Sequence, residues 1–181
     1  MNDRAAASAR PMRVVLMGVS GCGKSTVGEG LAKHLGWRFV EGDSLHPSEN
    51  VAKMAAGQAL DDSDRAGWLT TLADVLGQAR SAGQGLVISC SALKRAYRDR
   101  LRAGDPQALF VHLDGSHAVI AARIAARTHL YMPASLLESQ FAALQPPGPD
   151  EQALQLSVQL PPAELIQTIA HHLQAQTCPT P

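Results

Sequence analysis

The chain has 181 residues, of which 45% are hydrophobic and 4% aromatic, and its 16 basic and 16 acidic side chains give a formal net charge of zero. This length is enough for one domain with a substantial core. The balanced charge and the absence of a basic run argue against nucleic-acid binding, and no apolar run is long enough to span a membrane. We therefore expect no nucleic-acid or membrane partner.

The two ends of the chain are expected to be tails. Residues 1–11 are small and polar and lack the apolar stretch of a secretory signal. We expect a flexible tail at 1–11, a single domain over 12–176 and a short tail at 177–181. The three cysteines, Cys22, Cys90 and Cys178, show no metal-binding spacing and are expected to be reduced thiols in the cytoplasm.

A phosphate-binding loop is the clearest motif. Gly18-Val19-Ser20-Gly21-Cys22-Gly23-Lys24-Ser25 fits G-x-x-x-x-G-K-[ST]. An apolar, β-branched segment at 14–17 precedes it, and a helical pattern that stops at Gly36 follows it. A glycine-rich turn with a chance Gly-Lys-Ser is the alternative, but the strand before the motif and the helix after it favour the phosphate-binding loop.

The chemistry of this loop follows from its residue types. Glycines allow successive N–H groups to turn toward a phosphate, and the helix N-terminus adds a partial positive charge. Lys24 is placed to reach the β- and γ-phosphate oxygens, and the Ser25 hydroxyl to hold Mg²⁺. The predicted nucleotide ligands in this motif are Gly18, Ser20, Gly21, Cys22, Gly23, Lys24, Ser25 and Thr26.

The rest of the chain alternates between short apolar segments and helical patterns. After the first strand we expect strands at 37–40, 86–90, 109–113 and 154–158. We expect helices at 24–35, 50–56, 64–82, 94–102, 116–127, 134–144 and 161–174. A lid turn is expected just before the helix at 134–144. The proline-rich segment 145–150 is predicted to be a loop. This alternation predicts an α/β fold, a five-stranded parallel sheet flanked by helices.

Ligands of such sheets bind beyond the carboxyl ends of the strands, which brings the loop beside residues 41–43, 90–91 and 114–115. The chain has no N-K-x-D motif of a GTPase, and its third strand ends in Ser-Cys-Ser rather than in a carboxylate. Arg123 and Arg127 share a helical face before the expected lid and are candidates to stabilise a transferring phosphoryl group. The alternative is two solvated arginines.

Several later segments carry a family resemblance. Gly42-Asp43-x-x-His46-Pro47-x-x-Asn50-x-x-Lys53-Met54, and then Asp62-x-Asp64-Arg65-x-x-Trp68, closely resemble the bacterial gluconokinases. Further similar blocks lie at 90–99, 136–144 and 147–151. The resemblance implies a P-loop kinase fold like that of shikimate and adenylate kinases, with a small helical lid at about 128–140. It also implies transfer of the ATP γ-phosphoryl group to O6 of D-gluconate, in a cytoplasmic homodimer that uses ATP and Mg²⁺.

The candidate site residues follow from the resemblance and from the chemistry of a hydroxylated carboxylate. The predicted catalytic residues are Lys24, Asp43, Arg123 and Arg127. The predicted gluconate ligands are the cations Lys53, Arg65, Lys94 and Arg98 and the hydroxyl-binding groups Asp43, His46, Asn50 and Ser91. Asp43 would orient or deprotonate the acceptor hydroxyl, although a helix-capping role is the alternative. His46 could equally be a turn residue, and Trp68 and Met54 are expected in the core.

The loop 145–151 is predicted to border the adenine, with Pro147, Asp150 and Arg123 as further nucleotide ligands. The sequence departs from the family pattern at Ala59 and Gly67, where proline is common, and at His129, which stands one place early, so no lid histidine is assigned a role. Two alternative functions stay open: a kinase for another small acceptor, and a nucleotide-binding regulator without turnover. A regulator would not need an acceptor site.

Overall fold

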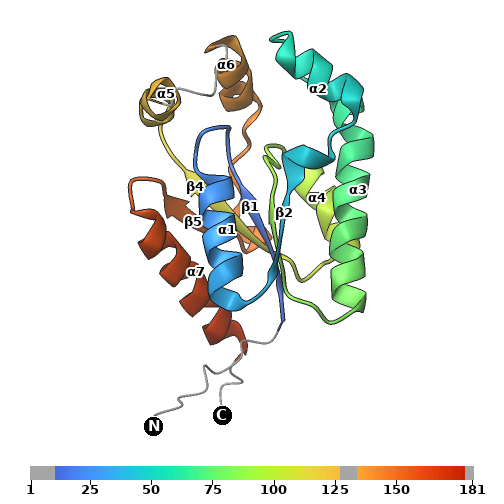
Figure 1. Ribbon diagram of the computed structural model, residues 1–181, viewed down its shortest axis with the longest axis vertical. Helices are drawn as coiled ribbons and strands as arrows, with labels where there is room; N and C mark the ends of the chain where they lie inside the picture. Colours follow the sequence, from blue (N-terminus) through green and yellow to red (C-terminus); the bar gives the residue numbers. More distant parts are fainter. Residues whose placement is uncertain (1–10, 127–133, 178–181) are drawn as a thin grey trace.

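The computed structural model describes residues 11–126 and 134–177, which form a parallel five-stranded sheet between helices (Figure 1). The sheet has the order β2-β3-β1-β4-β5. Its strands are β1 (Arg13–Met17), β2 (Arg38–Glu41), β3 (Leu86–Ser89), β4 (Leu109–Asp114) and β5 (Leu154–Ser157). The predicted fold class and all five strands are confirmed, with boundaries that differ by one residue.

Helices cover both faces of the sheet and gather at the carboxyl ends of its strands (Figure 1). They are α1 (Lys24–Leu35), α2 (Ser48–Ala55), α3 (Asp62–Ser81), α4 (Arg95–Gly104), α5 (His117–Ala125), α6 (Ala134–Ala143) and α7 (Pro162–Thr177). Two 3₁₀ turns are η1 (Gly42–Leu45) and η2 (Pro149–Glu151). Within the described part of the chain, no helix combines the length and apolar character that a membrane crossing requires.

The central strand β1 shows why the sheet is covered on both sides. Val14 and Leu16 are buried in a core shared with α1 and α7, whereas Val15 and Met17 are buried in a second core shared with α3 and α4. All four side chains have no exposed surface. Since alternate residues of a strand point to opposite faces, an unbroken apolar strand requires a layer of helices on each face.

Local sequence sets several helix boundaries. Gly36 ends α1 in the left-handed conformation, with φ of 68°, and the Ser116 hydroxyl caps α5 by accepting a hydrogen bond from the Val119 amide. The helix predicted at 64–82 begins earlier, at Asp62, because Asp61 and Asp64 form a capping box. The predicted loop 145–150 contains the start of η2, which begins at a proline. The helix predicted at 116–127 is α5, which ends at Ala125. The predicted helical position of Arg127 and the lid residues 128–133 lie outside the described residues.

A buried ion pair fastens the segment before β5 to α4. Both Nε and Nη2 of Arg98 donate to the carboxylate of Glu151, at 2.6 and 2.7 Å, and the two side chains are 1% and 2% exposed. Arg102 also donates to Glu151, and the Gly148 amide donates to it from the same loop. The hydrogen bond from Arg98, followed by those from Gly148 and Arg102, lowers the pKa of Glu151 from 4.5 to about 2, against the opposing effect of burial.

This ion pair predicts a pH-dependent stability. A carboxylate whose pKa is depressed in the folded state contributes stability above its ordinary pKa and loses it as the pH falls toward the folded value. At pH 7 we expect Glu151→Gln to lower the free energy of unfolding by about 3–5 kcal/mol, because it leaves the Arg98 charge buried and unpaired. The difference from wild type should shrink as the pH falls from about 4.5 toward 2, as measured by urea denaturation.

The exposed pair of Arg95 with Asp150 provides the control, since its carboxylate is 60% exposed. We expect Asp150→Asn to change stability little at any pH, because solvent screens such a pair. An equal loss at pH 7 and pH 3 for Glu151→Gln would contradict an ionised pair.

Candidate functional site

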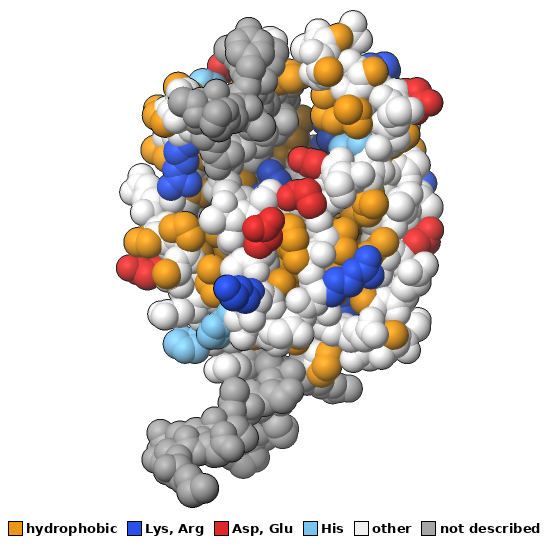
Figure 2. Space-filling view, viewed as in Figure 1, with side chains coloured by type: hydrophobic (Ala, Val, Ile, Leu, Met, Phe, Trp, Pro, Cys, Tyr) orange, Lys and Arg blue, Asp and Glu red, His pale blue; other side chains and the backbone are white. Residues whose placement is uncertain are grey.

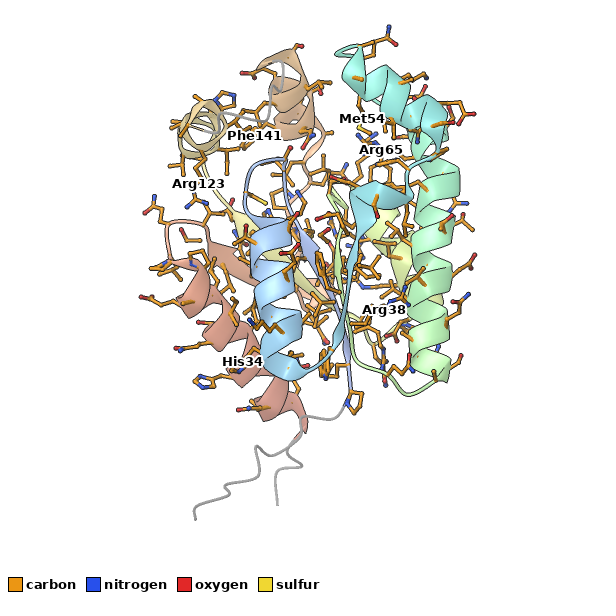
Figure 3. The ribbon with its side chains drawn as sticks, in the orientation of Figure 1. His34, Arg38, Met54, Arg65, Arg123 and Phe141 are labelled. Carbon is orange, nitrogen blue, oxygen red and sulfur yellow. The ribbon has the colours of Figure 1, made fainter. Side chains whose placement is uncertain are left out.

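Three cavities lie together where the strands of the sheet end, around the loop that precedes α1. In the space-filling view, basic and acidic side chains meet in the hollow between the part built by α2 and the part built by α5 and α6 (Figure 2). On the ribbon, Arg65 lies on the α3 side of this loop and Arg123 on the α5 side (Figure 3). The predicted edge of the sheet is therefore the edge at which candidate residues converge.

The first cavity, called the loop cavity, is the concave face of the phosphate-binding loop. Its volume is about 210 Å³, and it is lined by Ser20, Gly21, Gly23, Lys24, Ser25, Thr26 and Asp43. Gly21 has a φ of +83°, and a Cβ on it would lie 2.7 Å from Ile124 of α5, so glycine is required both by the turn and by this packing. The Lys24 ammonium is buried and donates to the carbonyls of Gly18 and Val19, each at 3.1 Å. This is a cradle for an anion, built of backbone amides, a helix N-terminus and one cation.

The oxygen donors of the loop cavity suit Mg²⁺. The hydroxyls of Ser25 and Thr26 and the carboxylate of Asp43 all line it, and hard oxygen ligands are those that Mg²⁺ prefers. Within residues 11–126 and 134–177, no group of three histidine, cysteine, aspartate or glutamate side chains could hold a metal. A magnesium ion at Ser25 would therefore share its coordination with phosphate oxygens, as is usual in phosphoryl-transfer sites.

The second cavity, called the side cavity, lies on the α5 and α7 side of the loop. It has a volume of about 270 Å³ and is lined by Cys22, Gly23, Thr26, Val27, Arg123, Ala126, Val158, Leu160, Pro162 and Leu165. One guanidinium nitrogen of Arg123 donates to the carbonyl of Val158, which joins α5 to the turn after β5. A flat apolar group that follows on from the loop cavity would fit between this arginine and the apolar side chains.

Pro147 and Asp150, the predicted adenine ligands, belong to the loop before β5. Neither residue lines this cavity or the loop cavity. Asp150 forms an ion pair with Arg95 at 2.6 Å, and the adjoining Glu151 is bound by Arg98, so the loop 145–151 is fastened against α4 instead. The turn after β5, and not the loop 145–151, borders the side cavity.

The third cavity, called the large cavity, lies on the other side of the loop. It has a volume of about 470 Å³ and is lined by Ala59, Leu60, Asp61, Asp62, Ser63, Arg65, Leu93, Lys94, Tyr97, Ser139, Gln140 and Ala143. Its walls are the start of α3, the segment that leads into α4, and α6. Eight of its twelve lining residues are charged or polar, while carbon atoms supply most of its accessible surface, so it can contact both the hydroxyls and the carbon chain of a ligand.

The cations predicted at this end of the molecule differ in their pairing. Lys94 donates to Asp62 at 2.6 Å, and Lys53 donates to Asp64 at 2.7 Å. These hydrogen bonds raise the pKa of both lysines. Arg65, by contrast, has no carboxylate within ion-pair distance among the described residues, and its guanidinium lies 5.8 Å from the ring centre of Tyr97. Arg65 is therefore the cation of the large cavity whose charge is left for a ligand.

Arg98, predicted to bind substrate, does not reach any of the three cavities. It has no exposed surface, and its Nη1 donates to the carbonyls of Ala92 and Leu93 while its other nitrogens bind Glu151. Ala92 has a φ of 42°, a left-handed conformation that is costly for a residue with a Cβ. Arg98 is thus corrected to a structural residue, which holds the turn that presents Leu93 and Lys94 to the large cavity.

His46 and Asn50 form a small network above Trp68. The His46 ring stacks on Trp68, with ring centres 4.0 Å apart, and the Trp68 indole nitrogen donates to the Gly42 carbonyl. The amide nitrogen of Asn50 donates to the Asp64 carbonyl and lies 3.3 Å from Nδ1 of His46. Since that nitrogen can only donate, Nδ1 accepts and Nε2 of the neutral ring carries the proton. Trp68 is in the core, as expected, whereas Met54 is only partly buried and belongs to neither core. Buried Asn50 orients His46.

Asp43, Lys24 and Arg65 converge on one buried group. The pKa of the Cys90 thiol is raised to about 12, first by burial; Asp43 raises it further, while Lys24 and Arg65 lower it. Burial also lowers the pKa of His46. The charge of Asp43 opposes this decrease, and the charge of Arg65 adds to it. All three charged side chains therefore act on the Cys90 thiol. Ser91 follows Cys90, and its carbonyl accepts from the Gly18 amide at 3.2 Å.

Sequence interpretation missed some residues that the structure brings into the site. Val158, Leu160 and Pro162 follow β5, and the rule that ligands lie beyond strand ends could have identified them. Tyr97 and Gln140 lie in segments that carried the family resemblance but received no role. Arg127 lies outside the described residues.

Comparisons with known proteins agree with this geometry. Residues 20–145 match the family model described as Shikimate kinase. The chain is 48% identical to a gluconokinase of Gluconobacter oxydans over 92% of this chain and 94% of that protein. It is also 45% identical to the thermoresistant gluconokinase of Escherichia coli, over 76% of this chain and 78% of that protein.

A solved structure shows the same architecture. The crystal structure of a gluconokinase from Sinorhizobium meliloti superposes with a TM-score of 0.85 and 42% sequence identity, covering 93% of this chain and 94% of that one. The similarity in sequence and in structure extends over nearly all of the chain. The chain therefore belongs to the gluconokinase family, within the larger group of kinases that the shikimate kinase model describes.

Proposed function

We propose that this protein phosphorylates D-gluconate, transferring the γ-phosphoryl group of ATP to O6 and forming 6-phospho-D-gluconate and ADP. The observation that carries the proposal is the row of three cavities. The loop cavity, lined by Lys24, lies between an apolar side cavity and a polar large cavity with an unpaired arginine. Relatives named gluconokinases match over nearly the whole chain.

Each cavity suits one part of the two substrates. The side cavity offers apolar side chains and the plane of Arg123 to an adenine ring. The loop cavity offers amides and Lys24 to the phosphates. The large cavity suits the acceptor, because charged and polar residues line it and it lies on the opposite side of the loop from Arg123 of the side cavity. Donor and acceptor would therefore meet at the loop.

Arg65 is proposed to bind the carboxylate of gluconate. Lys53 and Lys94 already have carboxylate partners, whereas Arg65 has none among the described residues. A guanidinium offers two parallel N–H groups that match a carboxylate. Placing the carboxylate at Arg65 would direct the other end of the open-chain acceptor toward the phosphates.

The residues around the loop can carry the transfer. The O6 oxygen forms a bond to the γ-phosphorus while the bond to the β–γ bridging oxygen breaks, and the O6 proton is taken up by Asp43. Lys24 stabilises the negative charge on the phosphoryl oxygens, and the amides of the loop do the same.

Ser25 would hold Mg²⁺, which when bound neutralises phosphate charge. Arg123 is proposed as a further cation, on the base side, and Ser91 and His46 as hydroxyl ligands.

The two alternative functions fit less well. A regulator that only senses nucleotide would not need the large cavity beside the loop. A nucleotide acceptor would place a second base in the large cavity, whose walls carry the four charged side chains of Asp61, Asp62, Arg65 and Lys94. ATP and Mg²⁺ use, a homodimer and a cytoplasmic location remain predictions of the family resemblance.

An acceptor screen tests the proposed function. With ATP and Mg²⁺, we expect ADP release to depend on gluconate and not on shikimate, AMP or sorbitol, which is the open-chain analogue without the carboxylate. Arg65→Met should raise the KM for gluconate by about tenfold or more, because a hydrogen bond to a charged group is lost. It should also reduce the preference for gluconate over sorbitol. Lys24→Ala, which removes the phosphate-binding cation, serves as the inactive control, and equal turnover of all acceptors would refute the proposal.

Asp43→Asn tests the proton acceptor. The amide keeps the size of the side chain but cannot take up a proton, so kcat should fall by roughly 10²–10⁴-fold while the KM for gluconate changes less. Asp74→Asn, an exposed position of α3, is the matched control and should leave both constants unchanged. A raised KM at normal kcat would show that Asp43 only binds substrate, and no change would show that it is a turn residue.

Leu160→Asp tests whether the adenine of ATP binds in the side cavity. Leu160 is 37% exposed at the rim of the side cavity, so the substitution should leave the fold intact. A carboxylate there would lose apolar contact with the adenine and repel the phosphates, and the KM for ATP should rise by about tenfold. Pro147→Ala, in the loop first predicted to border the adenine, should leave it unchanged. A raised KM for ATP in Pro147→Ala and an unchanged one in Leu160→Asp would show that the adenine lies against the loop 145–151.

A further inference from the structure

Gln140 of α6 connects two of the cavities through one side chain. Its Oε1 accepts a hydrogen bond from the backbone amide of Ser20, at 2.7 Å, although the two residues are 120 positions apart. Ser20 lines the loop cavity, and Gln140 itself lines the large cavity. The same amide group thus touches the crest of the phosphate-binding loop and the proposed acceptor site.

The chemistry of the amide fixes which atom faces each cavity. The Ser20 N–H can only donate, so the atom of Gln140 that meets it must be the carbonyl oxygen. Nε2 then remains as a donor, and it has no hydrogen-bond partner among the residues that the structure describes. An acceptor rich in hydroxyl oxygens supplies the partners that such a donor requires.

The backbone that carries Gln140 is firmly anchored. Leu137 is buried in the core that α1 and α7 share. The next residue, Glu138, binds Nε2 of His117 in α5 at 2.8 Å, and the centre of the Phe141 ring lies 5.1 Å from that of the His117 ring. Since α6 is held on both sides of position 140, the freedom that remains lies in the Gln140 side chain and in the loop that it touches.

That loop depends on glycines for its backbone conformation. Ser20 stands between Gly18 and Gly21, which both have positive φ. Glycines allow many backbone conformations, so holding the Ser20 amide in place limits the ensemble of the whole loop. A ligand that orders Gln140 from the large cavity would also order the loop, and a nucleotide that orders the loop would order Gln140. The ordering cost would then fall on the first ligand only, which makes the second bind more tightly.

We propose that Gln140 is a positioning residue that couples acceptor binding to the conformation of the phosphate-binding loop, with its Nε2 donating to a hydroxyl of the acceptor and its Oε1 holding the Ser20 amide. This proposal rests on the proposed function, since it takes the acceptor to be gluconate. Gln140 takes no part in bond formation. Its effect is that the loop reaches its ordered form when the acceptor is present, which favours transfer to O6 over transfer to water.

The test compares the affinity for a non-hydrolysable ATP analogue with and without gluconate, by calorimetry. In wild type we expect gluconate to raise this affinity by roughly fivefold or more, as is typical of coupled sites. Gln140→Met fills the same space but makes neither hydrogen bond, and the ratio should fall to about one while the affinity without gluconate changes little. Gln140→Glu keeps an oxygen for Ser20 but has no N–H donor, so it should keep the thermal stability of wild type and still lose the coupling.

Gln145 provides a matched control. Its Oε1 also accepts from a backbone amide, that of Arg95 at 2.8 Å, but it lines none of the three cavities. Gln145→Met should therefore keep the wild-type ratio. The ratio of ATP hydrolysis without acceptor to gluconate phosphorylation should rise in Gln140→Met and not in this control.

The outcomes separate the two proposals. An unchanged affinity ratio in both Gln140 variants, or no coupling in wild type that does phosphorylate gluconate, would overturn the role of Gln140. Absence of gluconate phosphorylation in wild type would overturn the proposed function, and the same measurement would then be made with the acceptor that the screen identifies. If Gln140→Met fails to fold, Gln140→Glu still decides the question.

Discussion

The buried pair of Arg98 and Glu151 is the interaction on which the acceptor side of the molecule depends. One guanidinium joins the loop before β5, the start of α4 and the turn at Ala92. Removing a charge from water is costly, and only a partner with good geometry offsets that cost. The consequence of this pair is a fixed backbone. It holds Ala92 in its left-handed conformation, and the segment after Ala92 forms a wall of the large cavity. A pair far from the phosphates thus determines the shape of the site.

Much of the fold could be predicted from the sequence, because the signals were local. Short apolar segments alternating with helical patterns require a parallel sheet covered on both faces, and the glycines of the phosphate-binding loop have the positive φ that the motif implies. The exact start of α3 depended on a capping box between Asp61 and Asp64, which is visible in the sequence but easily taken for a polar turn. The carboxyl edge of the sheet was also predictable, since all parallel strands end there.

The partners of the charged residues could not be predicted in the same way. The helix that carries Arg98 is rich in basic residues and reads as a solvated face, yet this one arginine is completely buried. Lys53 and Lys94 read as ligands for a carboxylate, but tertiary structure gives each of them an aspartate from the start of α3. The side cavity depends on β5 lying beside β4, which places Val158 next to Arg123. Such pairings depend on how distant segments meet, and a single sequence does not contain that information.

The pairing pattern explains how a protein of zero net charge can bind two anions. Lysines bound to aspartates add little net field, so besides Arg123 of the side cavity the region offers a ligand two cations in different places: Lys24 in the loop cavity and Arg65 in the large cavity. Each would meet one anionic group, a phosphate or a carboxylate, and Asp43 acts on the region between them, where the hydroxyl and the γ-phosphate would meet. In the large cavity, Lys94 is paired with Asp62, so that these two charges largely cancel there. An acceptor with hydroxyls along its length and a single charge at its far end would satisfy this arrangement, whereas a doubly charged acceptor would leave one charge without a partner.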